Sequence, residues 1–362
     1  MKKLILTFVL LVIAVMACTH DDDDLLAPVI VPVSPVVFDL AAMPYDSLST
    51  YNFFSGNIAD LVPVQGVLPF APITPLFSDY AHKSRFVWMP PGAQAQYVDD
   101  HKPLDFDDGT ILIKNFWYDN VQPGNVKRIL ETRLLFKRNG LWEFGNYVWN
   151  DAQTEAVLDL SGSYKPLQWL DDNSQAHDVV YRIPSAAECF VCHKRNNVPE
   201  PIGPKPRNLN STYNYTDGPM NQLDKWVASG YLENNLPTVI ETTAKWDDPG
   251  VDINDRVRAY VDNNCAHCHS DDKHCDYRPI RFAWNETADP VNLGVCVAPE
   301  EVINADLTHI VARGFIDRSV LYHRIGSTDE TVRMPLLGRT VVHEEAVLLF
   351  GEWITALSPP CN

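Results

Sequence analysis

The pattern Cys-x-x-Cys-His occurs twice in this chain, at positions 189–193 (CFVCH) and 265–269 (CAHCH). Two cysteines at this spacing can form thioethers with the vinyl groups on one edge of a haem, and the following histidine can bind the iron. The alternative is a structural zinc ion, which also binds thiolates and imidazoles. The duplication favours two covalently bound c-type haems. Their attachment residues would be Cys189, Cys192, Cys265 and Cys268, and their proximal iron ligands would be His193 and His269.

The second motif lies between two expected helices. Residues 252–264 carry Val257, Tyr260 and Val261 on one helical face, and residues 344–357 repeat apolar side chains with the same period. Residues 251–362 are therefore expected to form a domain like that of class I cytochromes c, with the second haem. Such a domain takes its sixth iron ligand from a loop before the last helix, and Met334, followed by Pro335, fits this role. The competing ligands are His309, His323 and His343.

The first motif belongs to a shorter region, 185–250. Gly203-Pro204 follows His193 and is similar to the loop whose proline carbonyl supports the proximal histidine in cytochromes c. Met220, at the start of an expected helix over 219–229, is the candidate sixth ligand of this haem. An open coordination position also remains, as do three histidines: His82, His101 and His177.

Three cysteines lie outside the two motifs. Cys275 and Cys296 follow the second motif and are predicted to form a disulfide, with two unrelated thiols as the alternative. Cys361 would then have no partner.

The N-terminal residues have the features of an export signal. Residues 1–17 combine two lysines with an apolar run that is short for a membrane span, so they predict a signal peptide. Residues 15–18 (VMAC) resemble the lipobox of bacterial lipoproteins, in which Cys18 would become the lipidated first residue. An ordinary signal peptide is the alternative. We therefore expect an extracytoplasmic, membrane-anchored lipoprotein, on the outer membrane or on a periplasmic or cell-surface face, with residues 18–37 as a flexible tether.

The elements that must hold the haem motifs change in character along the chain. Residues 38–184 contain aromatic and β-branched runs separated by turn signals, of which Asn139-Gly140 is the strongest hairpin signal. Helical periods follow residue 185. The predicted fold class is thus multidomain β plus α: an antiparallel β-sandwich-like N-terminal domain, then a mainly α-helical, cytochrome c-like dihaem region.

Composition narrows the possible partners. The chain has 362 residues, 46% of them hydrophobic, so it can bury a core. Asp and Glu number 47 against 29 Lys and Arg, a net charge of −18, which argues against nucleic acid as a ligand. A redox partner protein with a basic docking patch would match this charge, and the N-terminal lipid would make the membrane a second partner.

Five segments resemble those of a family of bacterial envelope dihaem c-type cytochromes, and the resemblance extends over roughly 45–357. They are 74–80 (TPLFSDY), 129–133 (ILETR), 147–150 (YVWN), 263–269 (NNCAHCH) and 333–339 (RMPLLGR). The resemblance implies electron transfer through two haems and names no substrate. The alternative is a dihaem oxidoreductase, such as a peroxidase, in which one haem keeps an open distal position.

Overall fold

The computed structural model describes residues 33–361. The predicted signal peptide, Cys18 and most of the predicted tether lie outside these residues. Residues 34–361 cluster as one unit. Among the helices of 33–361, none is both long and apolar enough to cross a lipid bilayer.

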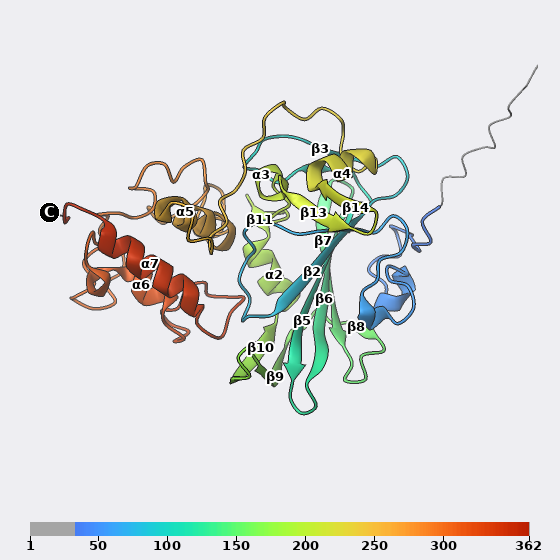
Figure 1. Cartoon of the computed structure of the whole chain (residues 1–362), viewed down its shortest axis with the longest axis horizontal. Coiled ribbons are helices and arrows are strands. Elements are labelled where there is room, and N and C mark those ends of the chain that lie inside the picture. The colour runs from blue at the N-terminus through green and yellow to red at the C-terminus, as the bar shows by residue number, and fades with distance from the viewer. Residues whose placement is uncertain (1–32, 362) are drawn as a thin grey trace, which may run out of the picture. The chain divides into compact units, whose positions relative to one another are not determined.

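An antiparallel sheet of eight strands lies at the centre of this unit (Figure 1). Six strands follow the order β1-β2-β5-β6-β7-β8, and the β9–β10 hairpin joins β5 where Val121 pairs with Trp169. The bounds are β1 Leu68–Phe70, β2 His82–Trp88, β5 Ile111–Val121, β6 Val126–Arg138, β7 Leu141–Trp149, β8 Ala156–Leu158, β9 Ser163–Leu170 and β10 Ala176–Ile183. Three two-stranded sheets accompany it: β3 Ala95–Gln96 with β4 Asp105–Phe106, β11 Lys194–Arg195 with β12 Val198–Pro199, and β13 Thr212–Tyr215 with β14 Gly218–Asn221.

The hairpin predicted at Asn139-Gly140 is confirmed. Arg138 pairs directly with Leu141, so the two residues form the whole connection between β6 and β7. Both have positive φ, 53° for Asn139 and 75° for Gly140, as a type I′ turn requires. This turn sets the register of β6 and β7, both of which contribute residues to a cavity described below.

The two faces of the sheet are covered differently. One face carries Phe86, Ile113, Leu134 and other apolar side chains, and residues 43–67 pack over it. On the opposite face, helix α4 (Gln222–Ala228) covers one end, where Trp226 packs near Leu112. At the other end β10 packs its Tyr181 in a cluster with Phe116 and Tyr118. Between these two clusters the second face carries charged side chains and opens onto a cavity.

Helices occupy little of the chain after residue 185. They are α2 Ala186–Cys192, α3 Pro206–Leu209, α4 Gln222–Ala228, α5 Ile253–Asn264, α6 Val320–Ile325 and α7 Glu344–Ala356. Three 3₁₀ turns complete the described elements: η1 Leu48–Tyr51, η2 Ile58–Asp60 and η3 Ile316–Arg318. The expected helices at 252–264 and 344–357 correspond to α5 and α7, which pack together through Val257, Phe350 and Trp353.

The predicted fold class is wrong. The structure is only 18% helical and 26% strand, and a mainly α-helical cytochrome c-like region is not seen in the described chain. Residues 266–315 form turns and loops, because they are rich in Asp, Asn and Pro, which favour turns over helix. The central sheet has no second large sheet packed on it within 34–361, so a sandwich is not seen either.

The loop at 74–80 ties the sheet to the C-terminal helical segments. Asn264, the last residue of α5, accepts a hydrogen bond from the Phe77 backbone N–H (2.7 Å). Asp79 accepts from the backbone N–H groups of Thr340 and Val341 (2.6 and 3.0 Å). These contacts hold the segment before α7 beside the sheet and so enclose the cavity.

Candidate functional site

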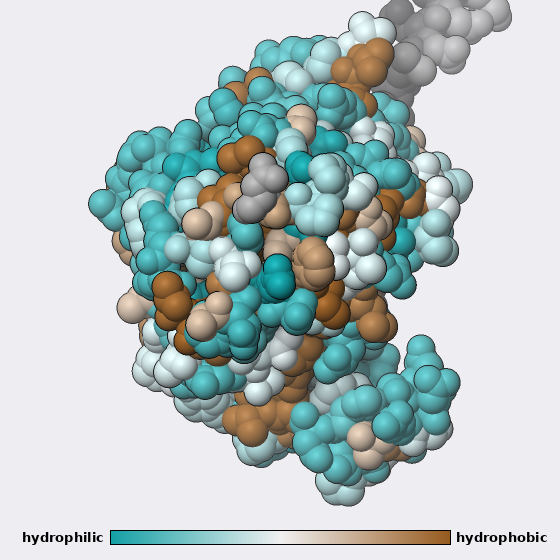
Figure 2. Space-filling view, turned by 90° about the vertical axis from the view of Figure 1, so that its left-hand side faces the viewer, coloured by the Kyte–Doolittle hydropathy of each residue, from teal (hydrophilic) through white to brown (hydrophobic). Residues whose placement is uncertain are grey.

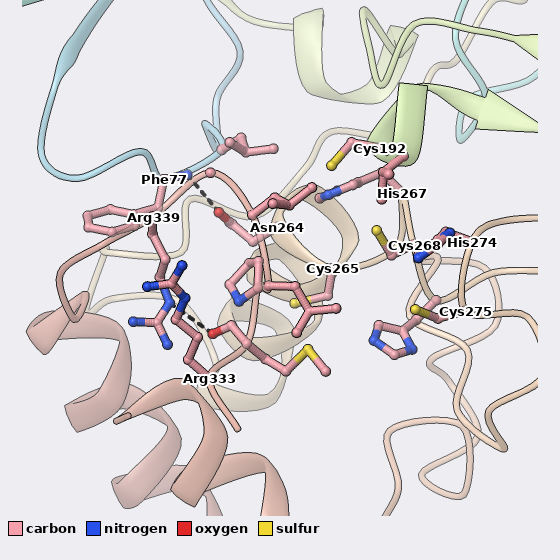
Figure 3. A pocket seen from close by; sticks show the side chains of 18 of the residues that line it. Phe77, Cys192, Asn264, Cys265, His267, Cys268, His274, Cys275, Arg333 and Arg339 are labelled. Carbon is pink, nitrogen blue, oxygen red and sulfur yellow. Dashed lines mark hydrogen bonds between the residues drawn. The ribbon is translucent and has the colours of Figure 1, made fainter. Parts of the chain in front are cut away.

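Both Cys-x-x-Cys-His motifs line the same cavity. Its volume of about 520 Å³ falls within the roughly 300–1,000 Å³ typical of cofactor and ligand sites. Its walls come from β6, β7 and α2, from the end of α5, and from the segments at 274–282 and 333–347. Figure 3 shows Cys192, Cys265 and Cys268 together at this cavity. Residues 189–193 and 265–269, more than 70 positions apart in sequence, therefore meet in space.

Helix α2 presents the first motif. Ser185 caps the helix by accepting from the Glu188 backbone N–H, and the Glu188 carboxylate accepts in return from the Ser185 N–H. Cys189 and Cys192 are three residues apart on this helix, so both thiols lie on one face. Burial raises the pKa of the Cys189 thiol to about 11, which keeps it protonated at neutral pH.

His193 follows α2 and is oriented by one hydrogen bond. Its Nδ1 lies 3.2 Å from the Glu200 carbonyl, which leaves Nε2 available to an iron. Such a bond is the usual support of a metal-binding histidine. Burial lowers the pKa of His193 to about 3, so the ring is neutral, as iron ligation requires. The expectation that the Pro204 carbonyl supports His193 is wrong, because that carbonyl accepts from the Leu104 N–H instead.

The second motif begins where α5 ends. Cys265 caps the helix, its N–H bonding to the Val261 carbonyl, and the chain then turns through Cys268 to His269. Burial raises the pKa of the Cys265 thiol to about 12 and lowers the pKa of His269 to about 4. The His269 Nδ1 is buried without a hydrogen-bond partner among residues 33–361. The ring is thus neutral and both of its nitrogens are unused by the described protein, but it lacks the supporting hydrogen bond that His193 has.

Cys192, His267 and Cys268 form a close group between the two motifs. One ligand atom from each lies within 4.8 Å of the others, and Figure 3 shows the three side chains converging. Hydrogen bonding between the two thiols lowers the pKa of Cys192 and raises that of Cys268. These three residues could hold a thiophilic ion such as zinc in a chain without haem. Sequence reasoning missed His267, since it considered the last histidine of each motif and distant histidines, but not one between the two cysteines of a motif.

Met334 also lines the cavity, at the segment before α7. Its backbone is held on both sides, because its N–H donates to the Arg324 carbonyl and its carbonyl accepts from Arg339 Nε (3.0 and 2.9 Å). Of its three competitors only His343 lines the cavity, and it stacks on Phe77 with ring centroids 4.0 Å apart.

Met220 is not brought to the cavity. It lies on β14, pairs with Tyr213 and is 40% exposed, and it is absent from the lining residues. The alternatives His82, His101 and His177 are also absent from the lining. The proposed ligation of the first haem by Met220 therefore has no support from the geometry, because β14 belongs to a separate two-stranded sheet.

The predicted Cys275–Cys296 disulfide is wrong. Cys296 is bonded to Cys361, the residue expected to be unpaired, while Cys275 is a buried free thiol at the cavity wall. The chain after α7 returns toward residues 311–313, where the Arg313 N–H lies 3.4 Å from the Cys361 sulfur. Sequence proximity favoured Cys275, whereas the path of the C-terminal segment decides the pairing.

The residues present fit covalently bound haem. All four motif cysteines are free thiols at one cavity, and both motif histidines are neutral with a ring nitrogen not used by the protein. No protein-family model, no curated protein and no solved structure matches this chain.

Proposed function

We propose that this chain is a lipid-anchored, extracytoplasmic dihaem cytochrome c that transfers electrons. A bound haem supplies one-electron chemistry at its iron. The observation that carries the proposal is the meeting of two complete Cys-x-x-Cys-His motifs at one cavity. No cysteine of either motif forms a disulfide within the described chain.

Each group of residues has a distinct role in this proposal. Cys189 and Cys192 tether one haem, and Cys265 and Cys268 tether the other. His193 and His269 bind the irons, and Met334 supplies the sixth ligand of the second haem. The Glu200 carbonyl fixes the ring orientation of His193 and increases its donor strength.

The molecular surface suits a protein partner of opposite charge. The net charge of −18 favours association with a basic docking patch. Figure 2 shows that hydrophilic residues cover most of the face in view, with hydrophobic side chains in separate groups between them. A weak electron-transfer complex needs only a small buried interface, so scattered hydrophobic groups would suffice.

Intact mass after acid–acetone extraction tests the proposal. The full chain should retain two haem masses, because thioethers survive extraction whereas non-covalent haem does not. The double variant Cys265→Ser/Cys268→Ser should retain one mass, and Cys275→Ser, a matched change of a free thiol at the same cavity, should retain two. Retention of no haem, with zinc bound instead, would contradict the proposal and favour the group formed by Cys192, His267 and Cys268.

Exposure of the reduced protein to carbon monoxide separates the carrier from the oxidoreductase. A carrier with two six-coordinate irons should leave the absorption spectrum unchanged. Rapid binding at one haem would instead favour an open distal position and the peroxidase-like alternative.

A further inference from the structure

Three cationic residues form one row across the central sheet. Arg85 on β2 pairs in register with Lys114 on β5, and Lys114 pairs with Arg133 on β6. Asn146 on β7 continues the row. Directly opposed residues project to the same face, so three like charges lie side by side, an arrangement that destabilises a sheet.

The protein neutralises only one end of this row. Glu131, fully buried, accepts from Arg133 Nε and Nη2 (2.9 and 2.5 Å) and from the Tyr181 hydroxyl (2.7 Å). Within residues 33–361, Arg85 and Lys114 have no ion pair and no side-chain hydrogen bond. The Phe116 ring offers partial compensation, lying 4.7 Å from Lys114 Nζ and 4.3 Å from the Arg133 guanidinium.

A further cation increases the imbalance. Lys83 lies two residues before Arg85 on the same face of β2, again with no ion pair among the described residues. Burial lowers the pKa of Lys83 to about 7, that of Arg85 to about 10 and that of Lys114 well below its ordinary value. Without a counter-ion, burial therefore disfavours the charged form of these side chains, and a bound anion would restore it.

The row opens onto the cavity beside the first motif. Lys114 and Arg133 line the cavity together with Cys189, Cys192 and His193. The charge of Arg133 acts on the Cys189 thiol, and the charges of Lys114 and Arg133 act on the His193 ring. Among residues 33–361, no hydrogen bond uses Arg133 Nη1 or Lys114 Nζ as a donor, so both groups can bind an anion in the cavity.

We propose that Lys114 and Arg133, with Arg85 next to Lys114 in the same row, form a binding site for a carboxylate held in the cavity. A guanidinium beside an ammonium gives strong, charge-assisted hydrogen bonds to a carboxylate. Two sources have this chemistry: the propionate groups of the haem attached at Cys189 and Cys192, or a free small organic acid. The first source rests on the proposed function, whereas the second does not.

The first experiment measures the reduction potentials of both haems in the full chain, in wild type and in Lys114→Gln. A cation beside a haem propionate favours the reduced state, so Lys114→Gln should lower one potential and leave the other unchanged. Lys165→Gln, which removes the same charge from a half-buried position on β9 outside the cavity lining, should leave both unchanged.

The second experiment titrates the same proteins with succinate and follows thermal unfolding. If a free acid occupies the site, wild type should gain stability in proportion to the logarithm of succinate concentration. Lys114→Gln should then need at least tenfold more succinate for the same shift, and Lys165→Gln should match wild type. If propionates occupy the site, succinate should not shift unfolding of the haem-loaded protein.

Arg85→Gln serves as the second variant, with circular dichroism as the check that each variant folds. The proposal is overturned if folded Lys114→Gln and Arg85→Gln both match Lys165→Gln in potentials and in succinate response. The proposed function can fail independently of this site. If the protein retains no haem but succinate stabilises it through Lys114, the chain is not a cytochrome and the carboxylate site remains.

Discussion

At the residue scale, the rings of the two motif histidines are held in different ways. His193 is oriented by the Glu200 carbonyl, whereas the His269 Nδ1 has no partner in the described chain. An unsupported imidazole rotates more freely and is a weaker donor. We therefore expect the second haem to depend more on its sixth ligand, for which Met334 is the candidate at the cavity wall.

Replacing Met334 by alanine should open the second haem. A thioether stabilises ferrous over ferric iron, so its loss should lower that haem's potential and allow carbon monoxide to bind. Met334→His should restore six-coordination at a lower potential than wild type. The measurement is an optical redox titration with and without carbon monoxide.

Met220→Ala is the matched control for Met334→Ala, because Met220 is a surface residue away from the cavity. It should change neither potential. If Met334→Ala behaves like Met220→Ala, then Met334 only packs against the cavity, and His343 becomes the better candidate for the second haem.

At the scale of elements, two links hold the C-terminal segments in place. One is Asp79, whose carboxylate joins the loop at 74–80 to Thr340 and Val341 before α7. The other is the Cys296–Cys361 disulfide, which joins the end of the chain to the loop after the second motif. Both connect segments that contribute no regular pairing to the sheet.

Asp79→Asn should alter the pH dependence of stability. Burial raises the pKa of Asp79 above its ordinary value of 3.8, so the unfolded chain releases this proton at lower pH than the folded protein. Wild type should therefore lose stability relative to Asp79→Asn as pH rises above 3.8 toward the folded-state pKa. Urea unfolding at several pH values measures the difference.

Asp79→Ala is the companion variant. It removes the acceptor of two backbone N–H groups and should cost about 1–3 kcal/mol in the free energy of unfolding. This loss should persist at every pH at which the protein folds. An Asp79→Asn variant whose stability parallels wild type at all pH values would show that the carboxyl is not perturbed.

The disulfide should be detectable and stabilising. Peptide mapping without reduction should find Cys296 linked to Cys361, and Cys275 alkylated only after unfolding. Replacing both bonded cysteines by alanine should cost about 2–4 kcal/mol, because the bridge restricts the unfolded chain. Cys275→Ala is the control and should cost less. A mapped Cys275–Cys296 peptide would contradict the pairing seen here.

At the scale of the whole molecule, the proposed location depends on the predicted anchor and on charge. The predicted lipidation site, Cys18, lies outside the described residues, and the tether would separate the folded unit at 34–361 from the membrane. The net charge of −18 of the whole chain would favour association with basic partners.

Cys18→Ser should release the protein from membranes or block its maturation, because serine cannot accept the thioether-linked lipid. Cell fractionation and N-terminal mass analysis measure both effects. Thr19→Ser, a change at the neighbouring position that keeps Cys18, should fractionate like wild type. If Cys18→Ser remains in the membrane fraction with an unchanged N-terminus, the anchor is not at this cysteine.

The sequence by itself determined the local features of this protein. Asn139-Gly140 defined a hairpin because only a two-residue turn with positive φ joins strands so tightly. The apolar periods at 252–264 and 344–357 marked α5 and α7 because each helix buries one face. The two Cys-x-x-Cys-His motifs can also be recognised in the sequence, because each consists of five neighbouring residues.

The tertiary structure alone decided the long-range relations. The meeting of Cys192, His267 and Cys268, the Cys296–Cys361 bond and the exclusion of Met220 all depend on the path of the chain between distant elements. The row of Arg85, Lys114 and Arg133 depends on strand register, which no single segment encodes. The expected mainly helical region is wrong for a related reason. Long-range contacts can hold loops in place, so these loops need no helical pattern in their sequence.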